Sequence, residues 1–120
     1  MTLSADLSDT IFDQIVAALA ERLILRFPNQ RLSEDDLVSF SARFGQLDMA
    51  PIRPSGLPVS GLRREINVLS NIVANSVPIG GIGNSESVWH QDITYKPLPP
   101  KARLLYAIEV PRDRWRHAFL

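Results

Sequence analysis

Val88-Trp89-His90-Gln91-Asp92-Ile93-Thr94-Tyr95 brings metal-binding residue types together at a spacing that has a geometric meaning. Its valine, tryptophan, isoleucine, threonine and tyrosine favour pleated backbone, and no glycine or proline interrupts it before Pro97, so it predicts a β-strand. Successive strand side chains point to opposite faces, which places His90 and Asp92 on one face with their Cα atoms about 6.6 Å apart. One metal ion fits between them. A second histidine from elsewhere would complete the two-histidine, one-carboxylate set that is typical of non-haem iron sites.

An ordinary strand with a surface histidine and aspartate shows the same spacing, so the neighbouring segments matter. Three of them accompany the strand: Phe27-Pro28-Asn29-Gln30-Arg31-Leu32, Arg43-Phe44-Gly45-Gln46-Leu47, and the run from Pro99 to Pro111. Together with Trp89-His90-Gln91-Asp92 they resemble, in the same order, segments of the taurine dioxygenase (TauD/TfdA-type) family of Fe(II)/2-oxoglutarate-dependent dioxygenases. The resemblance assigns residues 1–111 to the N-terminal part of that family's domain.

The resemblance implies an α+β fold, namely the N-terminal part of a double-stranded β-helix, or cupin-like jelly roll, with flanking helices and incomplete. It implies a dioxygenase that uses Fe(II), 2-oxoglutarate and O2 to hydroxylate a small anionic substrate of the alkylsulfonate, alkylsulfate or aryloxyacetate type. His90 and Asp92 are then two of the metal ligands. Asn84 and Glu86, in the segment that precedes the metal strand, are candidate substrate-binding residues, with solvated loop positions as the alternative.

The composition is that of a globular protein and excludes several other classes. A chain of 120 residues with 45% hydrophobic and 22% charged residues forms at most one domain with a modest core. The 13 basic and 13 acidic residues balance, so no nucleic-acid partner is expected. There is no cysteine for a disulfide or thiolate chemistry. No basic leader or long apolar run indicates a membrane, and we expect a cytoplasmic protein.

Two helices are predicted from their caps and apolar spacing. Ser8 or Asp9 can cap a helix that ends near Glu21-Arg22. Ser33 can accept from the amide of Asp36 and begin a second helix, which Gly45 stops in a left-handed conformation. The buried side of this second helix is expected to consist of Leu37, Phe40, Phe44 and Leu47.

Strands and loops make up the rest of the expected order. Residues 23–27 and 102–110 read as buried strands, and residues 66–72 alternate as a half-buried strand should. The proline-containing stretch 48–64 is expected to be a loop, where Arg53, Arg63 or Arg64 either meets an anionic substrate or, as we favour, is solvated. The glycine-rich stretch 77–87 fits a mobile loop better than a phosphate loop, because no helix comes after it.

The resemblance stops at Pro111. The family continues with a Gly-Gly-Asp-Thr-like segment, whereas residues 112–120 do not match it, which suggests a frameshift or a truncated gene. The family's distal metal histidine and its 2-oxoglutarate-binding arginine therefore have no equivalent here. His117 is the only other histidine, but its neighbours do not match the distal motif.

Three functions are compatible with the sequence. The first is the dioxygenase, and the second is a non-catalytic remnant or a module of that fold that depends on a partner. A metallohydrolase is the weakest, because the additional ligands in motif spacing are missing. An unclosed barrel exposes strand edges, so we also expect a homo-oligomer or other self-association.

Overall fold

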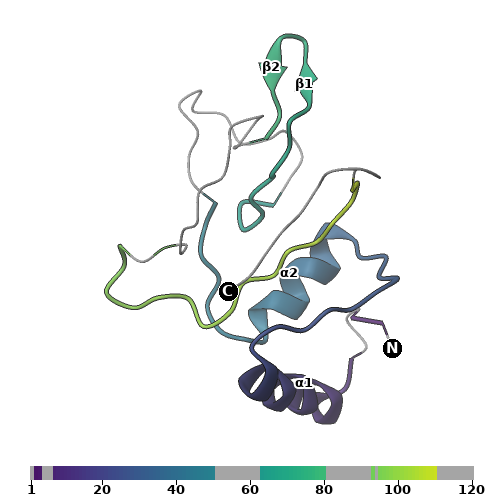
Figure 1. Cartoon of the computed structure of the whole chain (residues 1–120), viewed down its shortest axis with the longest axis vertical. Coiled ribbons are helices and arrows are strands. Elements are labelled where there is room, and N and C mark those ends of the chain that lie inside the picture. Colours follow the sequence, from purple (N-terminus) through teal and green to yellow (C-terminus); the bar gives the residue numbers. More distant parts are fainter. Residues whose placement is uncertain (1, 4–6, 51–62, 81–92, 94, 111–120) are drawn as a thin grey trace.

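The computed structural model describes residues 2–3, 7–50, 63–80, 93 and 95–110. The elements follow in the order α1 (Asp9–Arg22), α2 (Glu34–Ala42), β1 (Val73–Ala74) and β2 (Val77–Pro78). The two helices lie close together, and the β1–β2 hairpin projects at the far end of the molecule (Figure 1). No helix among the described residues is long and apolar enough to cross a membrane.

Helix α1 confirms the first predicted helix. Its N-cap is Ser8, whose hydroxyl accepts a hydrogen bond from the Ile11 amide at 3.4 Å. The helix ends when Leu23 adopts a left-handed conformation with φ of 65° and donates its amide to the Leu19 carbonyl at 2.8 Å. The predicted buried strand that begins at Leu23 is wrong, because the Leu23 side chain is 79% exposed and no strand forms there. Leu23 takes the cap position that glycine usually fills.

Helix α2 begins at Ser33, as predicted, and its start is a reciprocal capping box, of which only the Ser33 half was predicted. The Ser33 hydroxyl accepts from the Asp36 amide at 3.1 Å, and the Asp36 carboxylate accepts from the Ser33 amide at 3.0 Å. Gly45, at φ of 144°, comes after the helix end, so the chain does need a positive φ there. Phe40 is buried as expected and the other three predicted residues are partly buried, but the buried Val38 was not predicted.

The core lies between the two helices and the chain segments that cross them. Its buried members in the described part of the chain are Leu3, Phe12, Ile15 and Phe40. Phe12 meets Phe40 and Phe44 edge to face, with ring centroids 6.0 and 4.8 Å apart. The Arg43 guanidinium lies 4.2 Å above the Phe12 ring and donates to the Leu7 carbonyl and the Asp9 carboxylate. Arg43 therefore fastens the end of α2 to the start of α1.

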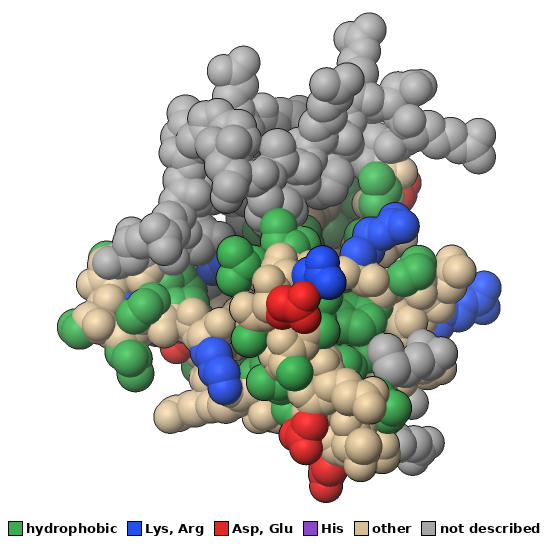
Figure 2. All heavy atoms as spheres, turned by 60° about the horizontal axis from the view of Figure 1, so that its bottom comes forward, with side chains coloured by type: hydrophobic (Ala, Val, Ile, Leu, Met, Phe, Trp, Pro, Cys, Tyr) green, Lys and Arg blue, Asp and Glu red, His purple; other side chains and the backbone are tan. Residues whose placement is uncertain are grey.

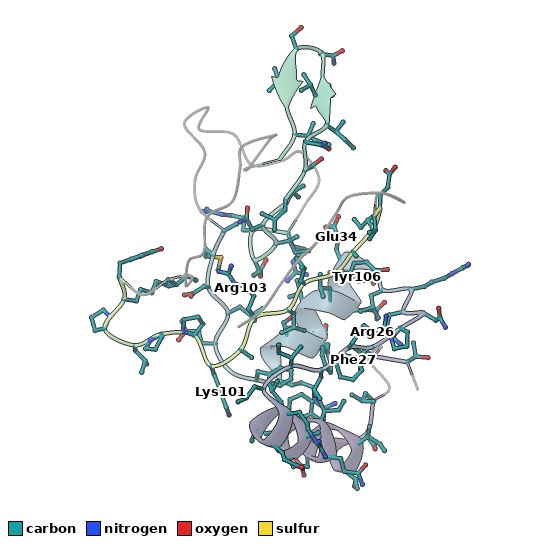
Figure 3. The ribbon with its side chains drawn as sticks, viewed as in Figure 1. Arg26, Phe27, Glu34, Lys101, Arg103 and Tyr106 are labelled. Carbon is teal, nitrogen blue, oxygen red and sulfur yellow. The ribbon has the colours of Figure 1, made fainter. Side chains whose placement is uncertain are left out.

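Tyr106 ties the C-terminal segment to this helical layer (Figure 3). Its hydroxyl accepts from the Leu32 amide at 3.1 Å and donates to the Gln30 carbonyl at 3.3 Å. The Gln30 side chain in turn accepts from the Leu3 amide at 2.9 Å. Leu104 packs against the core two residues before Tyr106. Three segments that are distant in the sequence thus meet at Gln30.

Removing the Tyr106 hydroxyl tests this tether. Tyr106→Phe keeps the ring but takes one partner from the Leu32 amide and one from the Gln30 carbonyl, so the free energy of unfolding should fall by about 1 kcal/mol. Urea denaturation followed by far-UV circular dichroism measures the loss. Tyr95→Phe is the control, because the Tyr95 side chain is 80% exposed. Equal losses in the two variants would contradict the tether.

The β1–β2 hairpin was not predicted. Its strands pair antiparallel, with Val73 opposite Pro78 and Ala74 opposite Val77. The turn residues Asn75 and Ser76 have φ of 50° and 64°, the left-handed values that suit the twist of a two-residue hairpin. The missed signal is Asn75, because asparagine adopts these angles more readily than most residues. Part of the expected glycine-rich loop is therefore a strand.

The described residues do not show the strands of a jelly roll. Residues 66–71 keep the predicted alternation, since every second side chain is partly buried and the others are exposed. Residues 102–107 show the same alternation, and residues 107–110 are exposed, although a buried strand was expected from 102 to 110. Neither stretch pairs with a strand in the described part of the chain, and the only sheet there has two strands. The predicted strands at 66–72 and 102–110 are wrong in this respect, because alternation sets which face is buried but a strand also needs a hydrogen-bonded neighbour.

Candidate metal centre

The four predicted site residues, His90, Asp92, Asn84 and Glu86, lie outside the described residues. Their shared face and their roles stay predictions. Within the described ranges, no group of three or more histidine, cysteine, aspartate or glutamate side chains could hold a metal ion. The structure describes the residues up to Gly80 and again Ile93 and residues 95–110, on either side of the stretch 81–92, which we call the metal stretch. These two flanks show how the metal stretch is attached to the fold.

The upstream flank is held by the hairpin and by a close backbone approach. The Ile79 amide donates to the Ile72 carbonyl at 3.0 Å, which extends the hairpin toward Gly80. Gly80 is buried against the backbone of Ser70, and a Cβ at this position would lie 2.6 Å from the Ser70 Cα. Only glycine fits here without a shift of the neighbouring backbone. The chain therefore enters the metal stretch from a fixed point.

The downstream flank is a turn. Ile93 has φ of 56°, and its carbonyl accepts from the Lys96 amide at 3.2 Å. The predicted strand from Val88 to Tyr95 is thus wrong at its end, because Ile93 and Tyr95 belong to a turn. A positive φ is unusual for a β-branched residue such as isoleucine and costs conformational energy.

Lys96 connects this turn to the segment that comes after α2. Its ammonium group lies 2.7 Å from the Asp48 carboxylate, and the Ala50 amide nearby donates to the Arg64 carbonyl at 2.8 Å. Both side chains of the ion pair are partly exposed, so its contribution to stability is about 0–1 kcal/mol. Its significance is positional, since it places residue 96 next to residue 48. Nothing in the sequence pattern singled out Asp48.

Arg63 is engaged by acidic residues at the start of α2. Its guanidinium donates to Asp35 at 2.7 Å and to Glu65 at 3.3 Å, and its amide donates to Glu34 at 3.2 Å. The hydrogen bond and charge of Glu65 raise the pKa of Arg63, and the hydrogen bond from Arg63 lowers the pKa of Glu65. The guanidinium thus joins residues 63–65 to α2. Arg63 is therefore ion-paired within the chain, whereas the favoured interpretation from the sequence was a solvated loop charge. Arg53 lies outside the described residues.

The lowered pKa of Glu65 predicts a pH dependence. A carboxyl group whose pKa is lower in the folded chain stabilises the fold at pH values above its unfolded pKa, and this stabilisation is lost as the pH falls through the folded pKa. Glu65→Gln should therefore be less stable than the wild type at neutral pH, with the gap closing under acid conditions. Urea titrations across the pH range measure the gap. Asp13→Asn, at an exposed position of α1, is the control substitution. A stability gap for Glu65→Gln that does not change with pH would contradict the pairing.

The surface of the helical end carries charges of both signs. In the view that brings this end forward, arginine, lysine, aspartate and glutamate side chains are scattered among hydrophobic ones (Figure 2). The described residues on this face form no patch of a single sign.

A family comparison decides which proteins this chain is related to. Residues 1–114 match the model of the family described as "Taurine catabolism dioxygenase TauD, TfdA family". The chain belongs to this family. This match confirms the resemblance inferred from the sequence. The TauD/TfdA family consists of oxidoreductases with a cupin-like jelly-roll fold.

Individual TauD/TfdA relatives agree with this assignment. Pentalenolactone F synthase of Streptomyces avermitilis is 32% identical over 110 residues, and the match covers 90% of this chain and 35% of that protein. (S)-phenoxypropionate/alpha-ketoglutarate-dioxygenase of Sphingobium herbicidovorans is 32% identical over 112 residues, covering 89% and 35%. Alpha-ketoglutarate-dependent 2,4-dichlorophenoxyacetate dioxygenase of Cupriavidus pinatubonensis is 27% identical over 111 residues, covering 88% and 39%. No solved structure matches the chain significantly.

The length of the match limits what the relatives imply. The chain spans about a third of the length of the curated relatives it matches. At the level of the family, the activity is that of a 2-oxoglutarate-dependent dioxygenase, which typically uses Fe(II). The activity, substrate and partners of this chain itself are treated as proposals below.

Proposed function

We propose that this chain carries the first half of the iron site of a 2-oxoglutarate-dependent dioxygenase, which acts in the cytoplasm. The observation that supports it best is the family match over residues 1–114, which contains Trp89-His90-Gln91-Asp92. Imidazole nitrogen and carboxylate oxygen are the donors that non-haem iron sites combine. The matching segments contain no equivalent of the family's distal metal histidine or of its 2-oxoglutarate-binding arginine, so water or 2-oxoglutarate would fill the remaining positions on the metal in the chain alone.

The chain's own residues have defined tasks in this proposal. His90 binds the metal through a neutral imidazole nitrogen, and Asp92 binds through its ionised carboxylate, so both must be deprotonated. Bound Fe(II) supplies the redox chemistry that couples decarboxylation of 2-oxoglutarate by O2 to hydroxylation of a substrate C–H bond. The turn at Ile93 and the contact of Gly80 with Ser70 fix the two ends of the stretch that bears these ligands.

A small anionic substrate fits this proposal. Two relatives act, by their names, on phenoxypropionate and 2,4-dichlorophenoxyacetate, which are both aryloxy carboxylates. An aryloxyacetate-type acid is therefore the first compound to test, followed by an alkylsulfonate and an alkylsulfate. Asn84 and Glu86 remain the proposed substrate contacts. An anion would be bound through the Asn84 amide, and Glu86 would instead accept from a substrate donor.

Metal titration of the purified chain tests the iron site. Anaerobic addition of Fe(II) and 2-oxoglutarate should give a weak visible charge-transfer band, and Fe(II) affinity should fall at least about tenfold in His90→Ala and in Asp92→Ala. His117→Ala is the matched control and should bind Fe(II) as the wild type does. If both ligand variants keep the wild-type affinity, the iron site does not lie here.

A second candidate is a partner-dependent module without activity of its own. It is favoured by the exposure of large apolar side chains such as Leu105, Ile108 and Val110 in the described residues, and by the short span relative to the relatives. Succinate formation distinguishes the two candidates. The module predicts no turnover by the chain alone and turnover when the remaining two-thirds of a relative is co-expressed with it. The dioxygenase predicts turnover by the chain alone.

A further inference from the structure

Ile93, which comes directly after the proposed ligand Asp92, has a backbone conformation that its own side chain disfavours. Its φ is 56°, and its side chain is half-buried. A left-handed conformation is costly for a β-branched residue, because the two heavy atoms on its Cβ crowd the backbone. Such a conformation persists only where surrounding contacts impose it, and examples of it cluster at functional sites. Ile93 must therefore be restrained by other parts of the fold.

Lys96 supplies this restraint through both its backbone and its side chain. Its amide donates to the Ile93 carbonyl at 3.2 Å, and its ammonium group lies 2.7 Å from the Asp48 carboxylate. The hydrogen bond closes the turn, and the ion pair holds the turn against the segment that comes after α2. That segment is itself held, because the Ala50 amide donates to the Arg64 carbonyl at 2.8 Å. A continuous series of contacts thus runs from Ile93 through residues 48–50 to Arg64.

This series of contacts ends at helix α2. Arg63 donates from its guanidinium to Asp35 at 2.7 Å and from its amide to Glu34 at 3.2 Å. Both acidic residues lie in the first turn of α2, whose start is fixed by its capping box. The turn at Ile93 is therefore oriented relative to a capped helix, and its conformation does not depend on its sequence neighbours alone.

We propose that Ile93 is a positioning residue for the metal ligand Asp92, held at its positive φ by the Lys96–Asp48 ion pair. One peptide bond joins Ile93 to Asp92, so the backbone angles of Ile93 set the direction of the chain between the turn and the ligand. A β-branched residue has a narrow range of left-handed angles, whereas glycine has a broad one. The isoleucine thus lowers the stability of the fold and narrows this direction. The proposal rests on the proposed iron site.

Glycine and alanine at position 93 separate strain from positioning. Both remove the isoleucine side chain beyond Cβ, but only glycine adopts a positive φ without steric cost. Ile93→Gly should therefore have a higher urea midpoint than Ile93→Ala, the reverse of their order at an ordinary φ. The Fe(II) affinity should follow the opposite order, with Ile93→Gly binding about tenfold more weakly than Ile93→Ala. A purely structural role would instead make affinity follow stability.

Leu23 is the matched control, because it also has a left-handed φ, of 65°, but lies at the end of α1. Leu23→Gly should again be more stable than Leu23→Ala, and the two variants should bind Fe(II) equally. Urea denaturation of the full chain followed by far-UV circular dichroism measures the midpoints. Anaerobic Fe(II) titration measures the affinities.

Charge exchange tests the restraint on the turn. Asp48→Asn removes the ion pair, so amide hydrogen exchange at Lys96 should accelerate and the Fe(II) affinity should fall. The double variant Asp48→Lys/Lys96→Asp reverses the pair and should recover the affinity lost in Asp48→Asn. Lys101→Met, at an exposed lysine of the same segment, should leave both measurements unchanged.

Three outcomes would overturn the proposal, and a fourth identifies failure of the iron site itself. Ile93→Ala being more stable than Ile93→Gly would show that no strain is held at this position. Fe(II) affinity that follows stability at position 93 would reduce the turn to a structural feature. Unchanged Fe(II) affinity in Asp48→Asn, in a chain where Asp92→Ala weakens binding, would remove the ion pair from the proposal. If Asp92→Ala leaves the affinity unchanged, Ile93 has no ligand to position.

Discussion

Replacing Phe12 with alanine is expected to lower the free energy of unfolding by about 3–5 kcal/mol, the range for a buried phenylalanine. The ring lies in the buried cluster between α1 and α2 and has edge-to-face contacts with Phe40 and Phe44. It also supports the Arg43 guanidinium, 4.2 Å above its centroid. Alanine would leave a cavity and remove both kinds of contact at once.

This loss is large relative to the total free energy of unfolding expected for a chain of this size. Small domains are stable by roughly 5 kcal/mol at the lower end of the usual range, and the buried core in the described residues is modest. Phe12→Ala should therefore leave a substantial unfolded population without denaturant. Far-UV circular dichroism at increasing urea concentration measures both the remaining helix and the shift of the midpoint.

Two further variants separate the contributions of volume and of the aromatic ring. Phe12→Leu keeps most of the volume and should cost clearly less than alanine, with the residual loss due to the ring contacts and the arginine. Gln14→Ala changes an exposed position of the same helix and should stay within about 0.5 kcal/mol of the wild type. If leucine and alanine at position 12 cost the same, the cavity is not the main cause.

The helices could be predicted from the sequence because their signals are local. Ser8 and Ser33 each bind an amide within three residues, so the start of each helix is decided by its own neighbours. The conformation at the end of α1 is harder to predict, because Leu23 has a left-handed φ and leucine shows no preference for such angles. The chain therefore leaves the helix at Leu23 in an exposed, irregular conformation instead of a strand.

The strands were less predictable because a strand depends on its partner. Residues 66–71 and 102–107 keep the alternating exposure that a period of two predicts. Alternation cannot specify which segment lies alongside, and in the described part of the chain neither of them is paired with a strand. The Asn75–Ser76 turn differs, since asparagine tolerates left-handed angles and is thus a local signal for this two-residue hairpin turn.

The candidate site divides in the same way. The spacing of His90 and Asp92 is a local pattern, and the family match over residues 1–114 supports its interpretation without testing its geometry. The contacts that hold the flanks are not given by the His90–Asp92 spacing, because Lys96 meets Asp48 from 48 residues away and Gly80 meets Ser70 at the base of the β1–β2 hairpin. Such contacts could not be inferred from spacing in one sequence.

Gly80→Ala is expected to have the second large effect, through one added methyl group. The new Cβ would overlap the Ser70 backbone nitrogen and carbonyl oxygen and would lie 2.6 Å from the Ser70 Cα. A backbone neighbour cannot rotate away as a side chain can, so residues 70 and 80 must move apart. We expect a loss at the upper end of about 1–3 kcal/mol, concentrated in the hairpin rather than in the helices.

Amide hydrogen exchange locates this loss. In Gly80→Ala, exchange at the Ile79 amide, which donates to the Ile72 carbonyl, should accelerate, whereas exchange within α1 should change little. Asn71→Ala is the matched control, because Asn71 is exposed and lies next to Ser70. Gly80→Ala should also weaken Fe(II) binding if the hairpin fixes the start of the stretch that bears His90 and Asp92. Unchanged exchange at Ile79 in Gly80→Ala would show that the two backbones do not touch, and the fixed entry to the metal stretch would then have to be given up.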